Sequence, residues 1–159
     1  MSYQAVILTV SDSCAAGTRT DTSGPAIRGM LENAGFAVQA MQTVPDEEGQ
    51  ISAAIVHACD ILQADLVVTT GGTGLSPRDV TPEATLAVLD REIRAIPVAM
   101  WVEGLKSTPR AMLSRAVAGI RGHTLVLNVP GSEKAARENL AAVVATLDHA
   151  LRMLAGGGH

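Results

Sequence analysis

Three short runs of mostly aliphatic residues each end in polar, glycine or proline residues. The runs are 3-YQAVILTVSD-12, 65-DLVVTT-70 and 123-HTLVLNVP-130. Apolar runs of this length without a polar face are typical of strands that are buried on both sides, as in a parallel sheet. Parallel strands need long crossover connections, which are usually helices. The runs therefore predict a fold in which strands and helices alternate.

The segments between these runs supply the expected helices. Residues 25–34 place apolar side chains at helical spacing and are followed by Gly35, a common helix terminator. Residues 36–45 alternate apolar and polar side chains, which suits a strand at the edge of a sheet. Further helices are predicted over residues 47–64, 82–92, 97–107 and 131–154, and residues 109–122 suit a helix followed by a short extended piece. This order predicts an α/β fold with three layers, αβα, around a mainly parallel central sheet.

The length of 159 residues, with 47% hydrophobic and 18% charged residues, suits one folded domain. We expect a single domain over residues 1–159, with an ordered core at about 5–154 and a flexible tail at 155–159. No apolar run is long enough to span a bilayer, and no secretory signal is expected. Cys14 and Cys59 have no metal-ligand spacing, so a cytoplasmic protein with reduced thiols is expected.

The charge pattern argues against nucleic-acid binding through a basic face with stacking rings. The net charge is −4, aromatic residues make up 2%, and no lysine-rich or arginine-rich run is present. A small-molecule ligand fits the composition better. If that ligand is an anion, its charge has to be met locally, by backbone amides, single basic residues or a metal ion.

Four predicted strand ends carry polar, glycine or proline residues directly after an apolar run. They are 10-VSDS-13, 44-VPDE-47, 69-TTGGTG-74 and 128-NVPGS-132. Ligands of open α/β sheets bind beyond the carboxyl ends of the strands, so these four ends are expected to form one site.

The glycine loop can offer backbone amides to an anion. Gly71, Gly72 and Gly74, with Thr73 between them, allow positive φ and leave no Cβ in the way. The alternative is a tight strand-to-helix turn without a ligand. The loop is neither a P-loop, because no Gly-Lys-Ser/Thr follows, nor the dinucleotide fingerprint, because the later glycine is absent.

Acidic residues beside such a loop suggest a cation. Asp79 could cap the next helix, but Thr81 is better placed for that role, which leaves Asp79 free to face the site. Because a carboxylate beside a phosphate needs a cation between them, Mg²⁺ fits Asp79 and, as a second ligand, Asp46. Asp46 could instead cap the helix at 47–64. Further candidates are Ser11, Asp12 and Asp21, for which turn or cap roles are the alternative.

Ser132 is a natural cap for the last helix, and Lys134 lies in the first turn of that helix. A helix N-terminus attracts anions, so Pro130, Gly131, Ser132 and Lys134 form a second candidate anion site. Ser132 as a plain cap remains the alternative. The sequence shows no Ser-His-Asp spacing and no zinc cluster.

Six motifs together resemble the molybdopterin adenylyltransferase family over about residues 5–154. They are TVSD (9–12), DTSGP (21–25), VPDE (44–47), TTGGTGLSPRDVTPEAT (69–85), TPRAMLSRAVAGIRG (108–122) and LVLNVPGSEKA (125–135). The resemblance implies an α/β fold of the molybdopterin-binding-domain type, a homotrimer, and a reaction in which the terminal phosphate of molybdopterin attacks the α-phosphorus of Mg-ATP and releases pyrophosphate. It also implies hand-over of the product to a separate molybdate-insertion protein.

By motif, Asp46 and Asp79 match the essential acidic residues of that family and are expected to hold Mg²⁺. Ser114 matches a serine that is important for molybdopterin binding. The glycine loop and the Pro130–Ser132 loop are expected to form the anion-binding rim, and Arg78 and Lys134 to meet phosphate charge. Two alternatives stay open: a molybdopterin-binding or carrier paralogue with little or no transferase activity, and an unrelated nucleotide-binding regulator.

Overall fold

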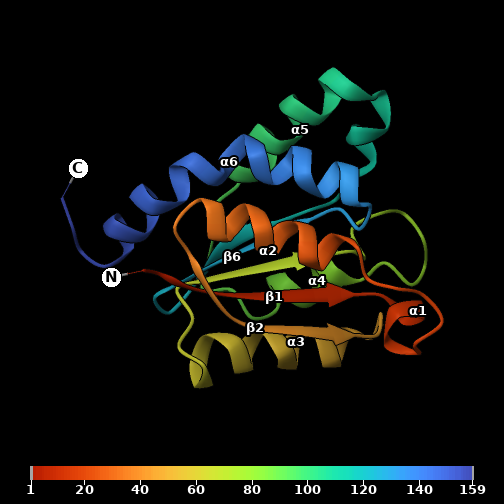
Figure 1. Ribbon diagram of the computed structural model, residues 1–159, viewed down its shortest axis with the longest axis horizontal. Helices are drawn as coiled ribbons and strands as arrows, with labels where there is room; N and C mark the ends of the chain where they lie inside the picture. The colour runs from red at the N-terminus through yellow and green to blue at the C-terminus, as the bar shows by residue number, and fades with distance from the viewer. Residues whose placement is uncertain (1, 159) are drawn as a thin grey trace.

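The chain folds around one six-stranded sheet in the order β2-β1-β3-β6-β5-β4. The computed structural model describes residues 2–158, and Figure 1 shows helices on both sides of the sheet. The strands are β1 (Gln4–Val10), β2 (Ala37–Val44), β3 (Leu66–Thr70), β4 (Arg91–Glu92), β5 (Ala118–Arg121) and β6 (Thr124–Val129). The helices are α1 (Asp12–Ala15), α2 (Ser23–Asn33), α3 (Glu48–Val56), α4 (Thr81–Leu86), α5 (Ala95–Ser107) and α6 (Glu133–Leu154), with a π-helical turn η1 (His57–Ile61) and a 3₁₀ turn η2 (Pro109–Leu113).

Four strands are parallel and bring their carboxyl ends to one edge. β1 pairs with β2 and β3, and β3 pairs with β6. Val10 is level with Val44, and Thr70 is level with both Thr9 and Val129. The three-layer, mainly parallel α/β fold expected from the sequence is therefore confirmed, and so is the edge position of β2.

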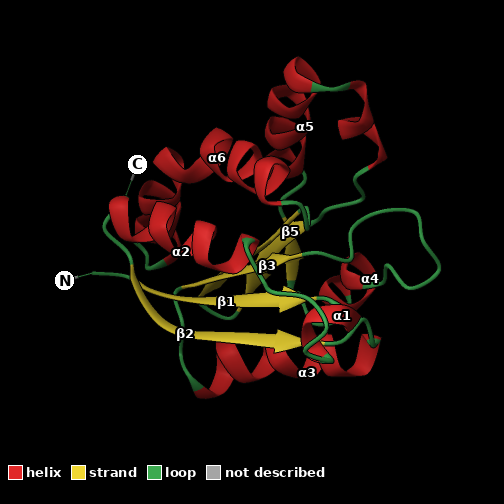
Figure 2. Cartoon of the chain, turned by 45° about the vertical axis from the view of Figure 1, so that its right-hand side comes forward, coloured by secondary structure: helices red, strands yellow, loops and turns green. Residues whose placement is uncertain are grey.

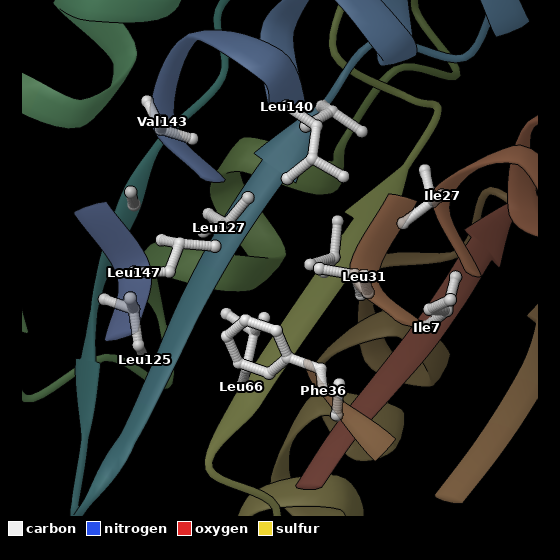
Figure 3. Packing of buried hydrophobic residues seen from close by; sticks show 14 of the residues in the cluster. Ile7, Ile27, Leu31, Phe36, Leu66, Leu125, Leu127, Leu140, Val143 and Leu147 are labelled. Atoms are coloured by element: carbon white, nitrogen blue, oxygen red, sulfur yellow. The ribbon is translucent and has the colours of Figure 1, made fainter. Parts of the chain in front are cut away.

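Each face of the sheet is covered by its own layer of helices. Ile7, Leu66 and Leu127 pack under α2 and α6, with Leu31 and Leu140 among the helix residues that meet them (Figure 3). The alternate side chains of the same strands point the other way and pack on α3 and α4. Because successive side chains of a strand alternate between faces, a strand that is apolar throughout packs against the helices on both sides of the sheet.

Two parts of the fold differ from the expectation. The helix predicted over 82–92 ends at Leu86, and Arg91–Glu92 forms β4, which pairs antiparallel with β5. β5 in turn pairs antiparallel with β6, so this side of the sheet is not parallel. A two-residue strand is too short to leave an alternation pattern, which is why the sequence did not reveal it.

The helix predicted over 47–64 is also interrupted, because α3 ends at Val56 and the π-helical turn follows. Beyond α6, Gly156 N donates to Met153 O and Gly157 N to Arg152 O, so these residues close the end of the helix. The flexibility expected for 155–159 stays a prediction, and residue 159 lies outside the described residues. None of the helices within residues 2–158 has the length and hydropathy needed to cross a membrane.

Candidate functional site

A polar pocket of about 480 Å³ lies at the carboxyl edge of the sheet, where the chain leaves β1 and β3. We call it the edge pocket; it is lined by residues 9–11, 14, 19–23, 46, 70–74, 79 and 130–132. The connections from β1 and β3 run to opposite sides of the sheet, which makes this the topological switch point where open α/β sheets bind ligands. The four strand ends singled out in the sequence all contribute to this pocket.

The glycine loop enters the pocket in a conformation that only glycine adopts easily. Gly71 has φ +102° and Gly72 has φ +70°. A Cβ on Gly71 would collide with the Val10 carbonyl, and one on Gly72 with the Thr81 hydroxyl. Gly74 has no positive φ, but a Cβ there would lie 2.9 Å from Asp79 Oδ2. The loop thus needs glycine both for its backbone angles and for the groups that lie against it.

Thr81 does not cap α4, contrary to the sequence prediction. Val80 is the N-cap residue, and within residues 2–158 no side chain accepts a capping bond there. Thr81 is fully buried and its hydroxyl donates to Gly71 O at 2.9 Å, while its backbone N donates to Gly72 O at 3.1 Å. Thr81 therefore fastens the start of α4 to the glycine loop (the loop between β3 and α4 is seen in Figure 2).

Asp46 and Asp79 both line the edge pocket, as the sequence predicted for a pair of acids. The capping alternative for Asp46 is wrong, because Glu47 is the N-cap residue of α3. Asp46 Oδ2 instead accepts from Asp12 N at 2.8 Å, and Asp12 Oδ1 accepts from Asp46 N at 2.9 Å. This reciprocal pair joins the ends of β1 and β2.

Asp79 is less free than the sequence suggested. Its Oδ2 accepts a hydrogen bond from Ser76 N at 3.0 Å, which closes a turn inside the loop. Burial raises the pKa of the Asp46 carboxyl, and the negative charges of Asp12 and Asp79 raise it further. The hydrogen bond from the Asp12 backbone and the positive charge of Arg78 act in the opposite direction and lower it. The two acids are therefore close enough to repel each other.

A magnesium ion fits this donor set. Within residues 2–158 there is no cluster of three or more acidic, histidine or cysteine side chains that could hold a metal ion by itself. Mg²⁺ commonly takes only one or two carboxylates and completes its shell with phosphate oxygens and water. Asp46 and Asp79 supply two carboxylates, and a cation between them would relieve their mutual repulsion.

Arg78 was expected to meet a phosphate, but in this structure it bonds to acidic neighbours. Its guanidinium donates to both Asp12 carboxylate oxygens, at 3.1 and 3.0 Å, and to Glu47 Oε1 at 2.9 Å. These hydrogen bonds, the one to Asp12 most of all, raise the pKa of Arg78 above its ordinary value. Arg78 therefore ties the glycine-loop segment to the beginnings of α1 and α3.

Two longer helices direct their N-termini toward the edge pocket. Ser132 caps α6 by accepting from Ala135 N at 3.3 Å, as the sequence predicted. At α2 the cap alternative for Asp21 is confirmed, because Asp21 Oδ1 accepts from Gly24 N at 3.0 Å, whereas Thr22 is the N-cap residue by position and makes no side-chain capping bond among the described residues. Helix N-termini carry partial positive charge, so the end of α6, which has a neutral cap, favours an anion in the pocket, while at α2 the Asp21 carboxylate already meets that charge.

The remaining candidates are split between the rim and a second pocket. Ser11 lines the edge pocket and caps α1 by accepting from Cys14 N. Ser114 and Lys134 lie instead in a neighbouring pocket of about 470 Å³, the side pocket, which also includes Arg110 and Asn139. The two pockets share Gly74, Pro130 and Ser132. The loops predicted as one anion-binding rim therefore form the wall between two spaces.

Arg19 is a pocket residue that the sequence reasoning missed. It is the only basic residue that lines the edge pocket in the part of the chain that the structure describes. Its position in the sequence could have identified it, because it lies between the candidates Asp12 and Asp21 in a loop that follows a predicted strand. Three aspartates against one arginine leave the pocket acidic, so a phosphate ligand would need an accompanying cation.

Backbone amides and helix N-termini suit an anion, while paired carboxylates suit a cation beside it. This combination at the switch point places the chain in the class of α/β proteins whose edge site suits a phosphate-bearing ligand. The sequence matches the family described as "Probable molybdopterin binding domain" over residues 6–149. The chain therefore belongs to that family.

Proteins similar to this chain carry names from molybdenum cofactor synthesis. The molybdopterin biosynthesis enzyme MoaB from Thermus thermophilus is 49% identical, with a TM-score of 0.92 and 97% of both chains covered. The molybdopterin adenylyltransferase of Helicobacter pylori is 38% identical over 94% of this chain and 86% of that protein. The molybdenum cofactor synthesis protein cinnamon of Drosophila melanogaster is 40% identical over 93% of this chain, which spans only 25% of that longer protein.

Proposed function

We propose that this chain transfers an adenylyl group from ATP to molybdopterin, as a step of molybdenum cofactor biosynthesis. The observation that carries the proposal is the pair of adjoining pockets, which share Gly74, Pro130 and Ser132. A transfer between two substrates needs two binding spaces that meet at the reacting atoms. The names of the Helicobacter and Escherichia coli relatives, both molybdopterin adenylyltransferases, support the same reaction.

The edge pocket suits the phosphates of ATP. The glycine loop and Gly131 bring backbone close to the ligand, and the N-terminus of α6 favours its negative charge. Arg19 adds a positive side chain at the rim. Asp46 and Asp79 would hold Mg²⁺, which supplies charge neutralisation on the triphosphate.

The side pocket suits molybdopterin. Ser114 offers a hydroxyl whose oxygen already accepts from Ala116 N at 3.3 Å, so its orientation is set. Arg110 and Lys134 provide two basic groups for a phosphate, and the contact from Lys134 Nζ to Glu138 Oε1 is long, at 3.9 Å. The terminal phosphate of the pterin would then face the shared wall at Gly74 and Ser132.

The reaction depends on the positioning of the two substrates more than on proton transfer. A phosphate oxygen of molybdopterin forms a bond to the α-phosphorus of ATP, and the bond from that phosphorus to the bridging oxygen breaks. The electron pair leaves with pyrophosphate, so adenylyl-molybdopterin and pyrophosphate are the two products. The residues of this chain hold the two phosphates in line and meet their charge, and no covalent enzyme intermediate is required.

The test is to incubate the purified protein with molybdopterin, magnesium and ATP labelled at its α-phosphate. We expect the label to appear in a pterin product, with one pyrophosphate released per transfer. If both substrates bind and no product forms, the chain is a binding or carrier paralogue. If ATP binds without any affinity for molybdopterin, the chain is a nucleotide-binding regulator instead.

We further propose that the chain forms a homotrimer and passes its product to a separate molybdate-insertion protein in the cytoplasm. An apolar stripe on α5 supports self-association: Val98, Val102 and Leu105 are 47%, 56% and 45% exposed. These residues lie at helical spacing on one face of α5, where copies of the chain would cover them.

A further inference from the structure

Arg115 holds both ends of the loop that carries Asp79. Its Nε donates to Gly74 O at 2.8 Å and its Nη2 donates to Asp79 O at 2.7 Å. Its Nη1 donates to Glu83 Oε2 at 2.6 Å, so α4 is joined to the same guanidinium. One side chain therefore fixes the entry of the loop, its exit and the helix that follows.

These anchors matter because the loop has few others. Residues 75–78 are exposed and belong to no helix or strand. Within the described residues, the other side-chain tie from this loop to a distant segment is that of Arg78 to Asp12 and Glu47. The position of the Asp79 carboxylate thus depends on where Arg115 holds the Asp79 carbonyl.

Arg115 also connects the two pockets. It directly follows Ser114, which lines the side pocket, and its backbone N donates to Thr73 O at 2.8 Å. Thr73 belongs to the glycine loop that lines the edge pocket. The segment that meets one ligand is therefore bonded, through main chain and side chain, to the loop that meets the other.

We propose that Arg115 is a positioning residue for the adenylyl transfer: it sets the Asp79 carboxylate in the edge pocket and couples it to the Ser114 segment of the side pocket. The inference rests on the proposed function, because it assigns Asp79 to the metal that accompanies ATP. In this proposal Arg115 contacts neither ATP nor molybdopterin and acts through Asp79.

Arg115→Lys is the informative variant. A lysine keeps the positive charge beside Glu83, but its single ammonium group cannot reach three acceptors arranged around a planar fork. The matched control is Arg121→Lys. Arg121 also uses Nε, Nη1 and Nη2, to bond the carboxylate of Asp60 and the carbonyl of Val88, and it lines neither pocket. Glu83→Gln is the second control, because it removes the ion pair and leaves the two carbonyl bonds.

The readout is the magnesium concentration that gives half-maximal turnover. We expect Arg115→Lys to raise this concentration about tenfold, the size typical of residues that orient a metal ligand. Arg121→Lys and Glu83→Gln should stay near the wild-type value, and the thermal midpoints of Arg115→Lys and Arg121→Lys should fall by similar amounts. An unchanged magnesium dependence in Arg115→Lys, or an equal shift in Arg121→Lys, would overturn the proposal.

A double-mutant cycle separates this role from general destabilisation. ATP affinity is measured by titration calorimetry, with magnesium and with a chelator, in Arg115→Lys, Asp79→Asn and the double variant. If Arg115 acts through Asp79, its substitution adds little once the carboxylate is gone; additive effects would refute the coupling. A wild-type chain that binds Mg-ATP without turnover contradicts the proposed function and still allows this cycle, whereas a chain that does not bind Mg-ATP overturns both.

Discussion

Asp79 is the residue on which the proposed chemistry depends most. It lines the edge pocket, and its only side-chain bond among the described residues is the one from Ser76 N. We predict that Asp79→Asn keeps the fold, because an amide oxygen can accept the same bond, and lowers turnover by about 100-fold or more through loss of a metal ligand. Circular dichroism and the product assay measure the two effects.

The matched control for this change is Asp148→Asn, on the exposed face of α6 and outside both pockets. It removes the same charge from the chain and should leave turnover unchanged. Turnover of Asp79→Asn within a few-fold of the wild type would remove Asp79 from the mechanism.

The sequence allowed us to predict which residues at the strand ends form the site, but not which hydrogen-bond partners they have. Asp46 and Asp79 come together in one pocket because the ends of parallel strands meet at one edge. Arg78 bonds to Asp12 and Glu47, which are 66 and 31 residues away, and the Thr81 hydroxyl bonds to a carbonyl 10 residues away. These contacts depend on how loops pass each other. Spacing along the chain carries no information about such bonds, and Arg115 was missed for the same reason.

At the level of elements, the junction between β3 and α4 should tolerate no side chain at Gly72. Gly72→Ala forces a residue with φ +70° to carry a Cβ that collides with the Thr81 hydroxyl and lies 3.2 Å from Asp46 Oδ1. We predict a loss of roughly 1–3 kcal/mol in the free energy of unfolding, measured with urea.

Gly49→Ala is the control for this substitution. Gly49 lies in the first turn of α3, and in the part of the chain that the structure describes no atom of another element lies within 4 Å of a Cβ there. Because alanine favours helix, this change should be neutral or stabilise the protein by up to about 1 kcal/mol. Equal behaviour of the two variants would show that the glycine loop is not constrained as described.

The opposite end of the sheet provides a prediction about pH. Two bonds from Arg121 hold the pKa of Asp60 below its ordinary value of 3.8 and tie η1 to β5. A lowered folded-state pKa stabilises the fold above the unfolded value, and this contribution is lost as pH falls through the lowered pKa. Asp60→Asn should therefore reduce stability at about pH 7 and less at about pH 3, as urea unfolding at both values would show.

If the loss of stability caused by Asp60→Asn were the same at both pH values, the ion pair would not contribute as described.

Some helices and strands could be predicted from the sequence pattern and others could not. The long helices were predicted from their apolar periodicity, and the buried strands from their continuous apolar runs. The π-helical turn at His57–Ile61 and the two-residue β4 were not, since both depend on contacts with other elements.

At the scale of the whole molecule, the exposed stripe on α5 predicts an assembly. Val102→Glu places a charge in the middle of the stripe and should convert a trimer to monomers, as light scattering would report. Ile61→Glu is the control, because Ile61 is 68% exposed on η1, away from α5. A wild-type chain that is monomeric at all concentrations would contradict the proposed trimer.

Cys14 reports directly on whether ATP phosphates occupy the edge pocket. Cys14 is half-buried and lines that pocket, while Cys59 is 2% exposed and burial raises the pKa of its thiol to about 11. Alkylation at neutral pH should therefore label Cys14 and spare Cys59. We predict that ATP with magnesium slows the labelling of Cys14, and more so than ATP with a chelator. Labelling of Cys14 at an unchanged rate under saturating Mg-ATP would show that ATP phosphates do not occupy this pocket.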